Sequence, residues 1–160
     1  MSVRVARATA QDIPLLLDFI RKLADYERMS DRVVVTEAAL SAALFGQRPV
    51  AEALLAYLGA EPAGFAVYFQ SFSTFLGRPW IYLEDIFVEP RHRRAGVGKA
   101  LMAAVAKLAI ERGGSMHWSV LKWNQSAIDF YKNLGAVEIT EWSGYRLSAE
   151  ALRRLAEEAS

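Results

Sequence analysis

A strand-like run that gives way to a helical pattern across a glycine-containing loop constrains this fold most. Residues 80–88 are mainly aromatic and aliphatic, which is typical of a strand. Beyond Pro90 the apolar residues recur at helical spacing, as Val97, Leu101, Val105 and Leu108. Gly113 and Gly114 end that pattern. A strand, a short loop and a helix in succession predict a chain of the α/β class.

The rest of the sequence supplies further strands and helices. Strands are predicted at residues 3–8, 51–58, 63–69, 116–120, 136–140 and 144–147, and a loop at 71–78. Thr9, Thr36 and Ser148 are predicted helix N-caps, and a short helix is expected at 124–133. The order β-α-α-β-β-β-α-β-α-β-β predicts a mixed sheet with helices on both faces, in a single domain of residues 1–160.

Composition excludes several classes of protein. The net charge of +1 gives no bulk basicity for nucleic-acid binding. Cysteine is absent, which rules out disulfides and thiolate chemistry and suits a reducing cytosol. The N-terminus lacks the apolar run of a signal peptide, and no run approaches the ~18 apolar residues of a membrane span. We therefore expect a cytoplasmic protein that acts away from membranes and nucleic acid.

The loop between residues 88 and 97 has the composition of an anion site. A helix N-terminus presents unpaired N–H groups, and Gly96 and Gly98 let a phosphate approach the backbone. Arg91, Arg93, Arg94 and Lys99 add positive charge. A dinucleotide loop would need a third glycine, and a P-loop would need Ser or Thr after the lysine. A solvated basic turn is the remaining alternative, and the strand–loop–helix context argues against it.

At these residues the sequence resembles the GNAT superfamily of acyl-CoA-dependent N-acetyltransferases. Arg93, Gly96 and Gly98 match its Gln/Arg-x-x-Gly-x-Gly/Ala motif, and residues 124–136 match its Asn-x-x-Ala-x-x-Phe-Tyr motif. The resemblance implies the GNAT fold and acetyl-CoA as cosubstrate. The coenzyme contacts that it implies are Ile86, Phe87, Val88, Arg93, Arg94, Ala95, Gly96, Val97, Gly98, Lys99, Asn124, Ser126, Ala127 and Tyr131.

Residues 82–88, 24–29 and 123–124 more narrowly resemble the diamine branch, which includes spermidine/spermine and thialysine N-acetyltransferases. Diamine enzymes have Asp-Pro-Trp where this chain reads Ser-Thr-Phe at 73–75. The missing carboxylate favours an amino-acid-like or short amine over spermidine. Resemblance also implies a homodimer, and Glu27 as an amine contact.

Acetyl transfer to an amine requires a base, because an alkylammonium has a pKa of ~10.4. Glu84 and Asp85 lie late in the strand 80–88, and alternation puts them on opposite faces, Asp85 with Ile81, Leu83 and Phe87. A β-bulge would relax that rule. Resemblance favours Glu84 as the base, directly or through water, with Asp85 as the ammonium partner. Tyr131 is the candidate general acid for the departing thiolate, since a phenol is protonated at neutral pH.

Two other interpretations stay open at this point. The chain could be a non-catalytic acyl-CoA-binding module, or a GNAT protein that acts on a protein amine. His92 and His117 lack the neighbours of a metal site, so no metal is expected. His92 is expected to flank the phosphates, and His117 to lie on the strand beside the coenzyme.

Overall fold

The computed structural model describes residues 2–159, which divide into two compact units. The first unit ends at Leu121 and contains the sheet, and the second runs from Lys122 onward. The described elements follow the order β1, α1, α2, β2, β3, β4, α3, β5, α4, α5, with short 3₁₀ turns before α1, α2 and α3. The single-domain prediction stays a prediction.

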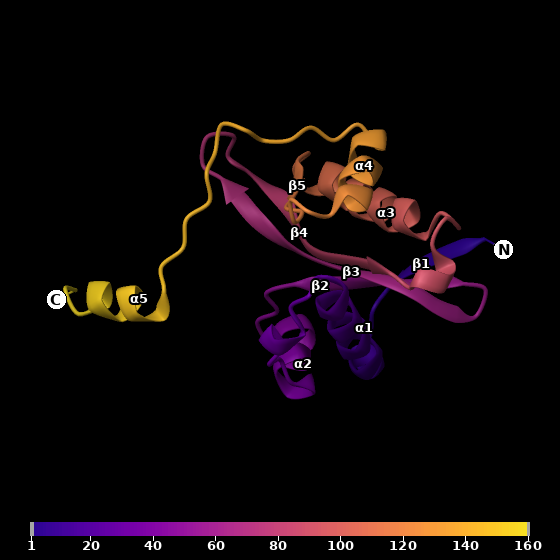
Figure 1. Cartoon of the computed structure of the whole chain (residues 1–160), viewed down its shortest axis with the longest axis horizontal. Helices are drawn as coiled ribbons and strands as arrows, with labels where there is room; N and C mark the ends of the chain where they lie inside the picture. Colours follow the sequence, from indigo (N-terminus) through magenta and orange to yellow (C-terminus); the bar gives the residue numbers. More distant parts are fainter. Residues whose placement is uncertain (1, 160) are drawn as a thin grey trace. The chain divides into compact units, whose positions relative to one another are not determined.

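A five-stranded mixed sheet forms the centre of the first unit (Figure 1). Its order is β1 (Val3–Arg7), β2 (Glu52–Leu58), β3 (Glu61–Ser73), β4 (Arg78–Val88) and β5 (Met116–Trp118). The first four strands pair antiparallel, and β5 pairs parallel to β4. A mixed sheet was the arrangement that the sequence predicted.

Helices cover both faces of this sheet, as predicted (Figure 1). On one face lie α1 (Ile13–Tyr26) and α2 (Glu37–Phe45), and on the other lies α3 (Val97–Arg112). The core of the α1 and α2 face includes Leu16, Phe19, Phe65, Val67 and Phe87. Phe19 stacks on Phe65 with ring centroids 5.7 Å apart, so α1 is fixed over the middle of the sheet.

The predicted caps hold the helix ends. The Ala39 N–H donates to the Thr36 hydroxyl at 3.1 Å, and the Ala151 N–H donates to the Ser148 hydroxyl at the same distance. The Thr9 N–H donates to the Asp12 carboxylate at 2.7 Å in the turn before α1. Each of these bonds gives a partner to a backbone N–H group at the start of a helix, where no preceding turn can accept it.

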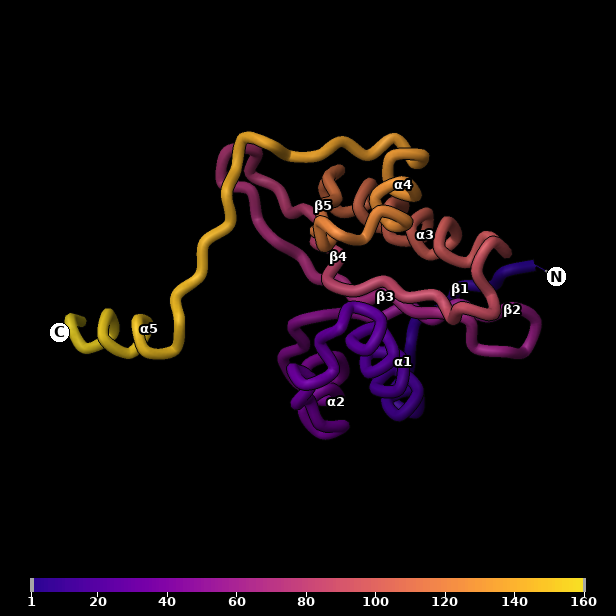
Figure 2. The backbone as a smooth tube through the Cα atoms, in the orientation of Figure 1, coloured from indigo at the N-terminus to yellow at the C-terminus, as the bar shows by residue number. Residues whose placement is uncertain are grey.

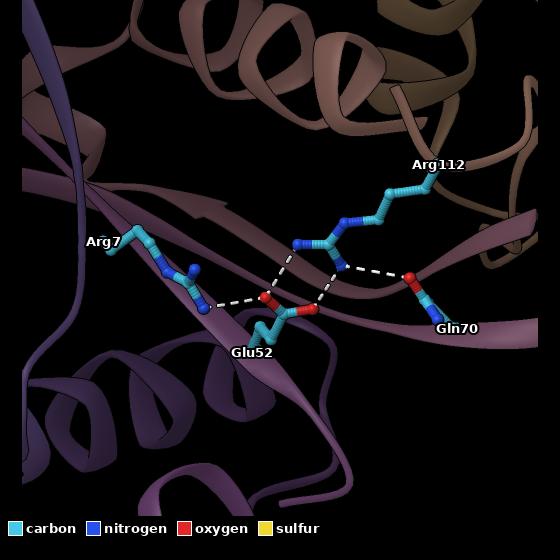
Figure 3. Close-up of polar contacts among 4 residues, drawn as sticks. All are labelled: Arg7, Glu52, Gln70 and Arg112. Carbon is cyan, nitrogen blue, oxygen red and sulfur yellow. Dashed lines mark hydrogen bonds and ion pairs between the residues drawn. The ribbon is translucent and has the colours of Figure 1, made fainter. Parts of the chain in front are cut away.

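Four residues on the α3 side of the sheet form a polar network (Figure 3). The Arg112 guanidinium at the end of α3 donates two hydrogen bonds to the Glu52 carboxylate and one, of 3.4 Å, to the Gln70 side chain. Arg7 donates to the same carboxylate at 2.8 Å. Since these residues come from β1, β2, β3 and α3, the network ties the end of the helix to three strands.

Three sequence predictions were wrong in detail. Residues 136–147 contain no strand, so the predicted final hairpin does not form. The predicted loop at 71–78 is shorter, because β3 continues to Ser73 and β4 begins at Arg78. The strand predicted at 116–120 ends at Trp118. The second unit instead consists of α4 (Gln125–Asn133), α5 (Ala149–Ala156) and irregular segments.

Candidate functional site

A β-bulge in β4 determines where the two predicted carboxylates lie. Tyr68 pairs with Leu83 and its neighbour Val67 pairs with Asp85, so Glu84 is the extra residue of the bulge. Asp85 therefore shares a face with Val67 and Phe87, the face that α1 and α2 cover. Simple alternation placed Asp85 on the same face as Leu83. That prediction is wrong, because the extra residue of the bulge puts Leu83 and Asp85 on opposite faces.

A third carboxylate, Glu27, acts on the same position from the end of α1. Glu84 is exposed, whereas Asp85 and Glu27 are half-buried. Burial, together with the charges of Glu84 and Glu27, raises the pKa of Asp85 to about 6. Burial also raises the pKa of Glu27. Three clustered carboxylates create a negative potential that favours a cation over either anionic or neutral ligands.

The loop after β4 leads into α3 through residues with left-handed backbone, a path that can be followed in Figure 2. Arg94 and Gly96 have φ of 65° and 84°. Gly96 is the N-cap of α3, and no side chain accepts a hydrogen bond at that cap. A Cβ on Gly96 would meet nothing within 4 Å. The helix N-terminus therefore presents backbone N–H groups beside open space, which suits a phosphate group.

The basic residues of the loop have different partners. The Arg93 guanidinium lies 4.9 Å from the Tyr26 ring centroid, and its Nε donates to the Val88 carbonyl at 3.4 Å. His92 lies 3.1 Å and Arg91 3.7 Å from the Glu61 carboxylate. Arg94, Ala95 and Lys99 are exposed beside Gly96. In this structure Arg93 thus packs on the end of α1.

Lys22 and Glu89 form a contact that sequence patterns did not single out. The Lys22 ammonium is paired with the Glu89 carboxylate and lies 3.1 Å from the Asp18 carboxylate. These carboxylates raise the pKa of Lys22 through hydrogen bonds. Lys22 lies on α1 and Glu89 immediately follows β4, so this pair and the Arg93–Tyr26 contact both fasten α1 to the glycine loop. Residues 67 positions apart carry no local signal of such a pair.

The second unit, described by itself, carries Asn124 and Tyr131. Asn124 is buried, and its side chain accepts a hydrogen bond from the Ala127 N–H at 3.3 Å, capping α4. Ser126 is exposed in the first turn. Tyr131 is half-buried, with its ring centroid 5.4 Å from that of Phe130. The predicted functions of these residues stay predictions.

The described residues contain neither a metal-ligating cluster nor a membrane-spanning helix. Within residues 2–159 no group of three His, Cys, Asp or Glu side chains could hold a metal ion. Over the same residues no helix combines the length and apolar character needed to cross a bilayer.

Comparison with known proteins relates this geometry to enzymes. The model of the acetyltransferase (GNAT) family matches residues 20–136. A thialysine N-epsilon-acetyltransferase of Sus scrofa is 40% identical, with 97% of this chain and 98% of the relative covered. An L-ornithine N5-acetyltransferase of Arabidopsis thaliana is 30% identical, with 97% and 88% covered. An integron cassette protein from the mobile metagenome of V. cholerae shares the fold with a TM-score of 0.81, 28% identity and 99% of each chain covered.

Proposed function

The chain belongs to the GNAT family of acetyltransferases, and we propose that it acetylates a primary amine of a small molecule with acetyl-CoA as the donor. The observation that carries the proposal is the position of three carboxylates at the bulge of β4, in the strand that leads directly into the glycine loop. The carboxylates suit a cation such as an ammonium substrate. The glycine loop suits the negatively charged phosphates of a coenzyme.

The loop and the first turn of α3 are the proposed coenzyme contacts. The open space at Gly96 and the uncapped N-terminus of α3 fit a pyrophosphate, with N–H donors from Val97, Gly98 and Lys99. Arg94 and Lys99 would add positive charge. When bound, acetyl-CoA supplies a thioester, whose carbonyl carbon the amine attacks. The backbone of residues 86–88 would line the thioester end, and Asn124, Ser126 and Ala127 are proposed contacts from α4.

The proposed acceptor is a lysine-like or thialysine-like amino acid or a short diamine. The names of the thialysine and ornithine acetyltransferases described above state that those relatives act on amines of this kind. Asp85 and Glu27 would hold the ammonium. A bound cation favours the ionised form of Asp85, so the negative charge of the cluster is largest when the substrate is present.

Glu84 is the proposed base. Its side chain is exposed at the bulge, where a water molecule can reach both the carboxylate and the amine. The carboxylate takes one proton from the ammonium, the amine nitrogen forms a bond to the acetyl carbon, and the carbon–sulfur bond breaks. Tyr131 would give its phenolic proton to the departing thiolate. The second proton that the nitrogen loses on becoming an amide would restore the phenol through water, and the proton held by Glu84 would leave to solvent.

The base and the ammonium partner are distinguishable by kinetics. We expect Glu84→Gln to lower kcat by about 100-fold or more with little change in KM, because proton transfer is lost. Asp85→Asn should mainly raise KM for the amine. If Asp85→Asn removes turnover and Glu84→Gln changes only KM, the two assignments are reversed.

The activity itself is tested by thiol release. Purified protein with acetyl-CoA and a panel of lysine analogues, diamines and an N-terminal peptide should release CoA in step with N-acetylated small amine. Binding of acetyl-CoA without turnover on any amine would identify an acyl-CoA-binding module instead. Preference for the peptide would identify an enzyme that acts on protein amines.

A cytoplasmic homodimer is proposed as the working form. In the second unit several large apolar side chains are exposed, among them Val137, Trp142, Tyr145 and Leu152. Exposed apolar side chains in such number are typical of a protein–protein contact. Light scattering should give a mass in solution of twice the chain mass, and Trp142→Ser should lower that mass. A monomeric mass for the native chain would contradict the dimer. Cell fractionation tests the location.

A further inference from the structure

Four ring side chains lie together on β3, β4 and β5, on the sheet face that α1 and α2 partly cover. We call them the aromatic face: Phe69, Trp80, Tyr82 and His117. Phe69 pairs across the strands with Tyr82, and Tyr82 pairs with His117 on its other side. Directly paired residues point to the same side of a sheet, so these rings form one continuous surface.

The bulge at Glu84 puts the aromatic face and Asp85 on the same side of the sheet. In a regular strand Tyr82 and Asp85, three residues apart, would point to opposite sides. Here Tyr82 pairs with Phe69 and Asp85 pairs with Val67, and residues 67 and 69 of β3 share a face. The row along β4 on this side is therefore Phe87, Asp85, Tyr82 and Trp80. Measured along β3, Tyr82 lies two residues, about 7 Å, from Asp85, and Trp80 four residues, about 13 Å.

Contacts among the rings hold the aromatic face in one arrangement. The centroids of Trp80 and His117 are 4.0 Å apart, edge to face, and those of Phe69 and Tyr82 are 5.3 Å apart. The Tyr82 hydroxyl is 3.0 Å from the Ser119 hydroxyl. His117 Nε2 is 3.0 Å from the Ser115 hydroxyl. A surface fixed in this way loses little side-chain entropy when a ligand binds.

The helices stop short of the aromatic face. The buried core beneath α1 and α2 contains Phe65, Val67 and Phe87, but none of the four rings. Each of the four is only half-buried, so part of its surface remains accessible. Rings that are held in place but incompletely covered offer apolar contact area next to the carboxylates.

The carboxylates of this face lie at one end of the row of rings. Glu27, Glu84 and Asp85 lie at the Asp85 end. At the other end the rings are uncharged, and burial lowers the pKa of His117, so its imidazole is neutral near pH 7. A complementary ligand places one ammonium group at the carboxylates and its carbon skeleton along β4 toward Trp80.

We propose that the aromatic face is the subsite for the carbon skeleton of the acceptor. The site should therefore also accept monoamines with an aromatic skeleton, and prefer them to alkyl monoamines of similar length. This inference rests on the proposed acetyltransferase function. The acceptor's amine would lie at the carboxylates, and its ring would pack against Tyr82 and Trp80. Offset or edge-to-face ring contacts add to affinity beyond the area that they bury.

The test compares kcat/KM for 4-phenylbutylamine and for n-octylamine, with acetyl-CoA as donor. The native protein should prefer 4-phenylbutylamine, which is long enough to place its ring beside Tyr82 and Trp80 when its amine lies at Asp85. Trp80→Leu should reduce that preference by about threefold to tenfold, the range expected for one aromatic contact. Phe72→Leu is the matched control, because Phe72 is an exposed ring of β3 that lies on the opposite side of the sheet from Phe69. That variant should keep the native preference.

A second variant and a binding measurement keep the proposal testable if Trp80→Leu does not fold. If Trp80→Leu does not fold, Phe69→Leu should show the same loss of preference. Calorimetry should also show weaker binding of 4-phenylbutylamine to the variant than to the native protein.

The contrary outcomes separate the two levels of the proposal. Equal kcat/KM for both amines, unchanged in Trp80→Leu, overturns the aromatic subsite while leaving the acetyltransferase function intact. A change of oligomeric mass in Trp80→Leu, with unchanged amine preference, also overturns it and identifies a subunit contact. Absence of turnover with every amine contradicts the proposed function itself.

Discussion

Replacing Asp85 by Asn should stabilise the protein at neutral pH. Burial and the charges of Glu84 and Glu27 raise the pKa of Asp85 from 3.8 to about 6. At 1.36 kcal/mol per pKa unit, this difference corresponds to about 3 kcal/mol of unfolding free energy. The native state therefore binds the Asp85 proton more tightly than the unfolded chain does, and an ionised Asp85 destabilises the native protein.

The sign of the effect fixes its pH dependence. Below the unfolded pKa of 3.8, Asp85 is protonated in both states, and Asp85→Asn should change stability little. The advantage of Asn should grow as pH rises from about 4 to about 6, and then level off at up to about 3 kcal/mol. Since Asp85 is the proposed ammonium partner, the same variant should bind the amine more weakly.

Urea unfolding of both proteins at a series of pH values measures this difference. Asp31→Asn is the matched control, because Asp31 is an exposed aspartate and should give a difference near zero at every pH. A destabilised Asp85→Asn protein at about pH 7.5 would refute the reasoning, since it would mean that the ionised carboxylate makes a favourable contact in the native state.

Three further substitutions test the framework of the site. Arg112→Met should lower the unfolding free energy by about 1–3 kcal/mol in urea titrations, because the Glu52 carboxylate loses two hydrogen bonds; unchanged stability would contradict this. Gly64→Ala should cost about 1–3 kcal/mol in the same assay, since its Cβ would lie too close to the Phe87 carbonyl oxygen of the neighbouring strand; full native stability would argue against that clash. Gly96→Ala should raise the calorimetric Kd for acetyl-CoA and lower stability by about 1–2 kcal/mol, because φ is 84° there; native affinity would argue against the loop as the phosphate site.

Helix boundaries were largely predictable because their signals are local. Thr36 and Ser148 cap the helices that they were predicted to begin, and Gly96 and Gly113 flank α3 as expected. A side-chain cap and a glycine both act within one helical turn. The sequence alone therefore contains most of the information that defines these ends.

The bulge and the final hairpin depended on strand pairing, which the sequence does not display locally. Nothing in residues 82–87 distinguishes a bulged strand from a regular one, because the extra residue is defined only by the register with β3. Residues 136–147 have a partly alternating pattern, but a strand also needs a neighbour to accept its backbone hydrogen bonds. In the structure this segment pairs with no other described strand.

Part of the candidate site could be predicted from the sequence. The glycine loop and the pair Glu84 and Asp85 follow from sequence, and the structure brings Glu27 close enough to act on Asp85. The Lys22–Glu89 pair and the aromatic face could not be predicted, because their members come from elements that meet only in the folded chain. Arg93 was expected among the phosphates, and the structure adds its contact with Tyr26.

Acetyl transfer measured on three proteins tests the central claim most directly. Native protein, Glu84→Gln and Tyr131→Phe are compared for CoA release with a lysine analogue, while acetyl-CoA binding is measured separately by calorimetry. We predict turnover by the native protein. Both variants should bind acetyl-CoA normally, and their turnover should fall by about 100-fold or more. Unchanged turnover in both variants would contradict the mechanism. Normal acetyl-CoA binding by a native protein that acetylates no amine would contradict the enzyme itself.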